Sequence, residues 1–135
     1  MSDALERLCA DQSKRLGAAL TRLVDAKAAD ELVSGLVQRR AAVWVESLGD
    51  MPIGFADLRA QAADAHGRGL PLVVENSLAT SFGCPACRLG ADVVVECLTR
   101  AWPEGTGRCV ALSASKACPS DLRVALAALP SAVFD

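Results

Sequence analysis

The sequence is poor in aromatic side chains and carries no excess of positive charge. Its 135 residues include three Phe, two Trp, no Tyr and a single His, and 14 basic side chains stand against 16 acidic ones. A weakly acidic chain without a basic stripe argues against nucleic acid as a partner, and so few rings leave no platform on which bases would stack. The hydrophobic fraction of 52% and the charged fraction of 22% exclude a disordered chain.

Long apolar runs are missing as well. No stretch approaches the roughly 18 residues of a membrane-spanning helix, and the start, Met-Ser-Asp-Ala-Leu-Glu-Arg, carries charges of both signs where an export signal would be apolar. We therefore expect no membrane association and a cytoplasmic protein whose six cysteines stay reduced. The length of residues 1–135 fits one domain with its own core.

The apolar pattern alternates between strands and helices. Runs typical of strands occupy residues 18–24, 41–46, 70–74, 91–95 and 109–112. Helical stripes occupy residues 5–16, 28–40, 55–67 and 119–129, and only Gln12 interrupts the first of them. Strands alternating with helices of about three turns predict an α/β domain, with a mostly parallel sheet, flanking helices and Trp44 in the core.

Polar residues follow three of the expected strands, at residues 46–48, 75–77 and 96–100. Ligands of parallel sheets bind beyond the carboxyl ends of the strands, so these positions are where a cofactor site would lie. Solvent-facing strand ends look the same, and topology alone therefore leaves the function open.

Three segments at these strand ends carry a resemblance to a known family. They read Val-Trp-Val-Glu-Ser at 43–47, Val-Val-Glu-Asn-Ser-Leu-Ala-Thr at 73–80 and Leu-Gly-Ala-Asp-Val-Val-Val-Glu-Cys-Leu-Thr-Arg at 89–100. The patterns they resemble are V-W-x-E-[ST]-P-[ST]-N-P, V-V-D-N-T-x-[AT]-[ST] and L-G-A-D-[IV]-V-x-H-S-x-T-K. The chain is thus similar to the Cys/Met-metabolism enzymes, the pyridoxal-phosphate (PLP) enzymes of trans-sulfuration such as cystathionine γ-synthase, cystathionine γ-lyase and methionine γ-lyase.

The resemblance is strongest over residues 17–112 and implies part of the large domain of a fold-type I PLP enzyme. By the same resemblance, the family's phosphate-cradling loop, its ring-stacking aromatic residue and its C-terminal domain have no counterpart here. Because family enzymes build their sites across subunit contacts, a homodimer is expected. A fragment of a sheet also leaves a strand edge and apolar faces exposed, which favours self-association.

Four positions that the resemblance assigns to the cofactor are changed. Arg100 occupies the slot of the lysine that forms the imine with PLP, and a guanidinium with a pKa of about 12 or more cannot serve as the amine nucleophile. Glu75 replaces the aspartate beneath the pyridine nitrogen. Cys97 replaces a phosphate-binding serine, and Asp50 replaces an asparagine, where its charge would repel the phenolate oxygen of the cofactor. The positions that match or nearly match are Asn76, Ser77, Thr80 and Thr99.

This pattern predicts a retained fold and a lost reaction. We expect a degenerate homologue that is inactive alone and acts as a binding or interaction module. An anionic or phosphate-bearing molecule, such as PLP held without a covalent bond, would bind near Arg100, Thr99 and Ser77. The alternative is an active PLP enzyme in which Lys116, or a partner chain, supplies the missing groups.

Cys84-Pro-Ala-Cys87 has the CxxC spacing of redox motifs and of half a zinc site, so a thiol or zinc-binding protein is a further alternative. A four-thiolate site would need two more cysteines from Cys97, Cys109 and Cys118. Packing as small apolar side chains is favoured, because the spacing is only half of a motif. His66 is expected to have a structural role at a helix end.

Overall fold

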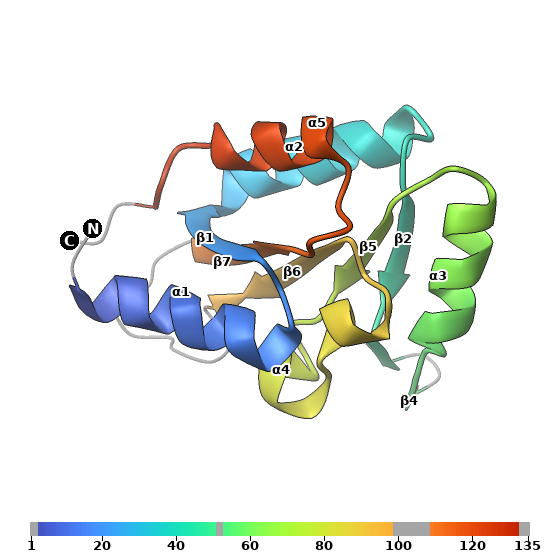
Figure 1. Ribbon diagram of the computed structural model, residues 1–135, viewed down its shortest axis with the longest axis horizontal. Coiled ribbons are helices and arrows are strands. Elements are labelled where there is room, and N and C mark those ends of the chain that lie inside the picture. Colours follow the sequence, from blue (N-terminus) through green and yellow to red (C-terminus); the bar gives the residue numbers. More distant parts are fainter. Residues whose placement is uncertain (1–2, 51–52, 99–108, 133–135) are drawn as a thin grey trace.

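Helices and strands alternate along the chain (Figure 1). The computed structural model describes residues 3–50, 53–98 and 109–132. The helices are α1 (Asp3–Leu16), α2 (Ala26–Gln38), α3 (Leu58–Gly67), α4 (Thr80–Gly83), the 3-10 helix η1 (Ala86–Leu89) and α5 (Ser120–Ala127). The strands are β1 (Leu20–Asp25), β2 (Val43–Glu46), β3 (Leu48–Asp50), β4 (Ile53–Phe55), β5 (Leu72–Glu75), β6 (Val93–Cys97) and β7 (Cys109–Ala114).

Five of the strands form one sheet in the order β1-β7-β6-β5-β2, and β3 and β4 form a separate hairpin. The pairs β2–β5 and β5–β6 are parallel, whereas β7 is antiparallel to both β6 and β1. Four of the five strands therefore run in one direction and only β7 runs against them. The prediction of an α/β domain with a mostly parallel sheet is confirmed.

Helices cover both faces of the sheet, with α2 and α5 on one side and α1 and η1 on the other (Figure 1). The first layer packs on a cluster that includes Val33, Val73, Val93 and Leu122. The second layer, to which α3 belongs, packs on the opposite face, where Leu72, Val74 and Val94 lie. Successive strand residues thus alternate between the two layers.

Local chemistry explains where the elements begin and end. Asp25 caps α2, since its carboxylate accepts a hydrogen bond from the N–H of Lys27 at 2.9 Å. Gly90 follows η1 with a φ of 110°, and a Cβ at that position would lie 2.5 Å from the Cβ of Ala62. Only glycine satisfies both conditions, so Gly90 fixes how η1 meets α3.

Two expectations about burial are wrong. Trp44 is 38% exposed, because β2 is an edge strand whose residues alternate between partly buried and exposed. A strand needs a neighbour on each side and a helix on each face to be buried throughout, and β2 has a neighbouring strand on one side only. Phe55 is 66% exposed on the β3–β4 hairpin and does not belong to the following helix, which starts at Leu58.

No helix of the described residues is both long enough and apolar enough to cross a membrane.

Candidate functional site

The carboxyl ends of β5 and β6 bring together three of the predicted site residues. Ser77 donates its N–H to Glu75 Oε1 at 3.1 Å, and its hydroxyl also donates to that oxygen. The same hydroxyl accepts the N–H of Cys97 at 2.8 Å. The parallel pairing of the two strands, which sets Glu75 opposite Val95, accounts for this proximity.

Asn76 lies at the same strand end but is 0% exposed. Its Oδ1 accepts the hydroxyl of Ser47 at 2.6 Å, and its Nδ2 donates to Glu96 Oε1 at 2.8 Å and to the carbonyl of Cys84 at 3.1 Å. The amide has no surface left for a ligand. The structure therefore gives Asn76 a structural role, joining the ends of β2, β5 and β6, in place of the direct cofactor contact predicted from the sequence.

The buried network continues through Glu96 into α1. Gln12 donates its Nε2 to Glu96 Oε2 and accepts the hydroxyl of Ser81 at 2.8 Å with its own Oε1. Arg15 donates to Gln12 Oε1 at 3.0 Å and to the Ser81 hydroxyl at 2.8 Å. In the sequence Gln12 stands out only as an interruption of an apolar stripe, although a polar residue on such a stripe signals a buried partner.

Glu96 is the buried acid of this site, at 4% exposure. Burial raises the pKa of its carboxyl group, and the nearby charge of Glu75 raises it further, against the opposing effects of the Asn76 and Gln12 hydrogen bonds and of the Arg15 charge. In the motif shared with the family this position is a histidine. Here a carboxylate occupies it and accepts two amide donors.

A groove runs along the α2 face of the sheet beside this site. One part encloses about 350 Å³ and is lined mainly by Lys27, Trp44, Val95 and Val110. Glu75 lies on the same face of the sheet, because its register partner Val95 is one of the residues that line the groove. Lys27 was missed as a candidate because it falls just before the helix expected at residues 28–40.

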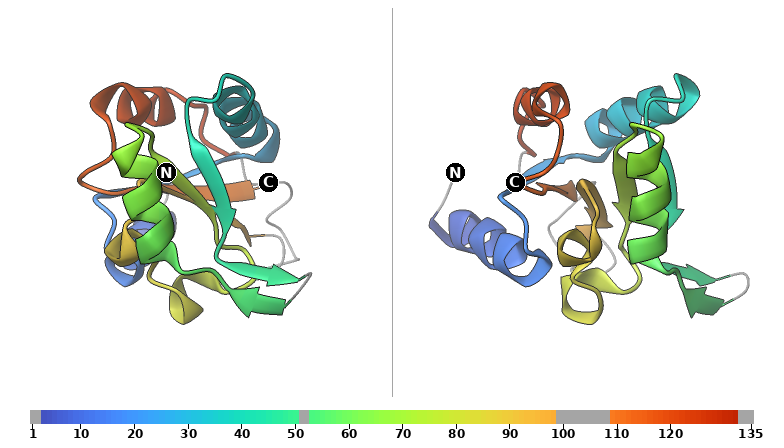
Figure 2. Two further views of the ribbon diagram at one scale, coloured as in Figure 1. Left: turned by 90° about the vertical axis from the view of Figure 1, so that its right-hand side faces the viewer. Right: turned by 45° about the vertical axis from the view of Figure 1, so that its right-hand side comes forward.

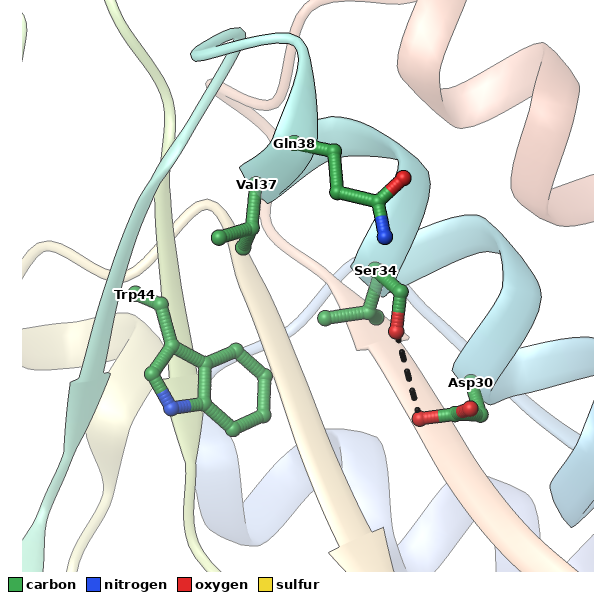
Figure 3. A pocket seen from close by; sticks show the side chains of 6 residues that line it. Asp30, Ser34, Val37, Gln38 and Trp44 are labelled. Atoms are coloured by element: carbon green, nitrogen blue, oxygen red, sulfur yellow. Dashed lines mark hydrogen bonds between the residues drawn. The ribbon is translucent and has the colours of Figure 1, made fainter.

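The groove continues along α2 through a second part of about 310 Å³ (Figure 3). The indole of Trp44 extends from β2 toward α2, where Val37, Ser34 and Asp30 line the opposite wall. Ser34 donates to Asp30 at 3.4 Å, so the polar groups of this wall bond mainly to one another. The two parts share Asp30, Val33 and Trp44.

Several predicted residues are placed elsewhere. Lys116 follows β7, whose last residue, Ala114, pairs with Val93 at the start of β6. It therefore lies at the amino ends of the parallel strands, whereas Glu75 lies at their carboxyl ends, and the structure does not bring the two together. Thr99, Arg100 and the side chain of Asp50 lie outside what the structure describes.

Cys84 and Cys87 form no disulfide with each other. Burial raises the pKa of both thiols, to about 12 for Cys87. A redox CxxC motif works through a thiol whose pKa is lowered, so these two cysteines have the opposite chemistry. Nowhere in the described residues do three or more His, Cys, Asp or Glu side chains come together as a metal site.

His66 lies near the amino ends of the parallel strands, at the opposite end from Glu75. Its Nε2 is 2.6 Å from Asp92 Oδ2, which also accepts the N–H of Leu72 at 2.7 Å. The buried Asp92 thereby ties the end of α3 to the start of β5. This geometry agrees with the structural role expected for His66.

An open, mostly parallel sheet with helices on both faces defines the class of open α/β domains, in which ligands bind beyond the carboxyl ends of the strands. Residues 3–123 match the family described as Cys/Met metabolism PLP-dependent enzyme, and the chain belongs to that family. It is 31% identical over 87 residues to a cystathionine gamma-lyase of Dictyostelium discoideum and 33% identical over 95 residues to a homocysteine/cysteine synthase of Kluyveromyces lactis. These matches cover 64% and 70% of the chain.

Solved structures place the fold among the fold-type I PLP enzymes. The chain superposes on apo CalE6, a methionine gamma lyase from Micromonospora echinospora, with a TM-score of 0.71 at 20% identity, over 93% of this chain and 47% of that one. The TM-score with a cystathionine gamma synthase from Xanthomonas oryzae is 0.68 at 16% identity, over 88% of this chain and 43% of that one. The chain spans only about a fifth of its curated relatives, 22% and 21% of the two named above.

Proposed function

We propose that this chain is a catalytically degenerate homologue of the trans-sulfuration enzymes, which acts as a binding or interaction module and retains weak, non-covalent binding of PLP or a related anion. The observation that carries the proposal is the position of Glu75. Its side chain, the candidate partner of the pyridine nitrogen, lies at the carboxyl end of β5, on the face of the sheet that carries a groove of about 350 Å³. Arg100 stands in the slot where the family has its imine-forming lysine.

The described residues fit one end of PLP. Glu46 lies opposite Glu75 in the β2–β5 ladder, so two carboxylates stand side by side on the α2 face. Adjacent carboxylates favour a positive charge, and a protonated pyridine nitrogen supplies one. The bound cofactor would offer an electron sink for carbanions and Glu75 would hold its ring nitrogen, while the hydroxyl of Ser77, which donates to Glu75 Oε1, would orient that carboxylate.

The proposed loss of the reaction has to be tested against the amines that the chain can offer. The sequence contains three lysines, Lys14, Lys27 and Lys116. Lys116 lies at the amino ends of the parallel strands, away from Glu75, and Lys14 lies in the last turn of α1. Lys27 lines the groove and is the amine against which an inactive chain has to be tested.

The test is a titration of the purified protein with PLP, followed by its visible absorption. We expect no imine band in the wild type and a band in Arg100→Lys, which would show that the site lacks only its amine. A wild-type band that borohydride bleaches would contradict the proposal. Its loss in Lys27→Ala or Lys116→Ala would then identify the amine of an active enzyme.

Non-covalent binding is measured separately by equilibrium dialysis. Glu75→Ala is expected to weaken the retention of PLP at least tenfold, since a hydrogen bond between charged groups contributes about 1.5–3 kcal/mol. Glu31→Ala, which removes an exposed carboxylate from α2, is the matched control. No retention by the wild type would contradict the binding part of the proposal.

Self-association in the cytoplasm completes the proposal. Members of the family are typically homo-oligomers, and an exposed strand edge favours a second copy. A partner chain that completes the fold is the alternative, and it would be recovered as a stoichiometric complex from the native source.

A further inference from the structure

The part of the groove shown in Figure 3 sets an aromatic wall opposite an acidic one, and the PLP proposal does not use it. It encloses about 310 Å³, which is in the size range of small-molecule sites. Trp44, 38% exposed, extends into it from β2, and α2 forms the opposite wall (Figure 3). We call this space the Trp44 pocket; the described residues that line it are Asp30, Val33, Ser34, Val37, Gln38 and Trp44.

The Trp44 pocket is open to solvent at the edge of the sheet. β2 is the edge strand and lies at the front of the molecule, between α3 and α2 (left view of Figure 2). Four of the six residues that line the pocket are exposed, namely Asp30, Val37, Gln38 and Trp44. A molecule from solution can therefore reach the indole without any rearrangement of the core.

The charge of the Trp44 pocket favours a cation. Asp30 is the only charged residue among the described residues that line it. No ion pair of Asp30 is found in the described part of the chain, where its carboxylate accepts one long hydrogen bond, at 3.4 Å, from the Ser34 hydroxyl. Lys27, which lines the groove too, lines only its other part. An unpaired carboxylate beside an apolar groove attracts a positive charge and repels a negative one.

The indole of Trp44 adds an attraction that a carboxylate alone does not offer. The face of an aromatic ring carries negative potential, and tryptophan attracts cations more strongly than the other aromatic side chains do. Figure 3 shows the two rings of the indole nearly face-on, with Val37 next to them. The methyl groups of a quaternary ammonium can contact Val33 and Val37, whereas a primary ammonium would lose hydrogen bonds to water there. The pocket thus fits a weakly hydrated cation best.

We propose that the Trp44 pocket binds a small organic cation of the quaternary ammonium class, which lies on the indole of Trp44 with Asp30 as its counter-ion. The site needs neither Glu75 nor a bound PLP molecule. Its test uses no PLP, so this proposal and the proposed function can fail independently of each other.

The probe is choline, and its matched control is the neutral isostere in which a carbon atom replaces the charged nitrogen. Binding is followed by the indole N–H resonance of Trp44 in nuclear magnetic resonance spectra of Trp102→Phe, which leaves Trp44 as the one tryptophan of the chain. Choline is expected to bind roughly 3- to 30-fold more tightly than the isostere. Asp30→Asn should weaken choline binding roughly two- to fivefold and leave the isostere unaffected. Glu31→Gln, at the next exposed position of α2, lies outside the pocket lining and should change neither affinity.

Trp44→Leu tests the indole itself and is read on the backbone amide resonances of α2, whose dispersion also reports whether the variant is folded. It should remove the preference for choline over the isostere. Equal affinities of the Trp102→Phe chain for the two compounds would overturn the proposal, because the pocket would then be merely apolar. An indole resonance that choline does not shift would overturn it too, as would a choline affinity that neither Asp30→Asn nor Trp44→Leu lowers.

Discussion

The buried carboxyl group of Glu96 makes the stability of the fold depend on pH. We take Glu96→Gln as the perturbation, because glutamine keeps the shape of the side chain and carries no group that ionises. In the folded chain the pKa of Glu96 is raised above its ordinary value of 4.5, chiefly by burial. The folded state therefore binds this proton more tightly than the unfolded state does.

The sign of the effect follows from that difference. At pH values below the unfolded pKa, Glu96 is protonated in both states and contributes no pH dependence. As the pH rises from 4.5 toward the raised folded pKa, the unfolded chain loses the proton first, and stability falls by up to about 1.4 kcal/mol per pH unit. Above the folded pKa the loss is complete and the curve is again flat.

The assay is urea unfolding of the wild type and Glu96→Gln at a series of pH values from 4 upward. At low pH Glu96→Gln should be less stable than the wild type by a fixed amount, because its NH2 group faces one of the two amide donors, Asn76 or Gln12, and that hydrogen bond is lost. As the pH rises, the variant should gain stability relative to the wild type. Glu31→Gln, at an exposed position, should run parallel to the wild type. A constant difference between Glu96→Gln and the wild type at every pH would refute the reasoning.

Two further predictions concern the scaffold and the cysteines. Gly90→Ala should lower the free energy of unfolding by about 2–4 kcal/mol in urea titrations, because its φ is positive and the new methyl group would collide with Ala62; Gly67→Ala, in α3, adds a methyl group that meets nothing within 4 Å and should leave that free energy unchanged or raise it by up to about 1 kcal/mol, and equal losses would contradict the argument. Cys87, with its pKa raised to about 12, should react with an alkylating reagent at pH 8 at least tenfold more slowly in the folded chain than in urea, as followed by mass spectrometry of the labelled peptide; equal rates in the two states would show an accessible thiolate.

Local periodicity determined the type of most elements but not their place in the sheet. The alternation of strand and helix patterns indicates the α/β class, because the spacing of apolar residues along a segment depends on whether that segment is a helix or a strand. The run at 41–46 has the composition of a central strand, yet β2 lies at an edge and leaves Trp44 exposed. Strand order depends on contacts between segments far apart in the chain, which no local pattern contains.

The direction of a strand is equally hidden from a local pattern. β7 reads as a short apolar run and is antiparallel to its neighbours, which carries Lys116 to the edge away from Glu75. The Gln12–Glu96 contact joins residues 84 positions apart, so it too follows from the tertiary fold alone. The proximity of Glu75, Ser77 and Cys97 could be predicted from the sequence, because consecutive parallel strands align their carboxyl ends.

The residues that match the family pattern divide by what they do in this chain. Asn76 and Gly90, which match, are explained by folding alone: one satisfies a buried network and the other adopts a positive φ in close contact with α3. Glu75 and Cys97, which differ from the pattern, lie on the face that borders the groove. Folding requires the first pair whether or not a cofactor binds, whereas only a cofactor would constrain the second. At these four positions the difference is the one that the proposed loss of the family reaction predicts, whereas Glu96, which stands where the pattern has histidine, is a change inside the buried network that Asn76 helps to satisfy.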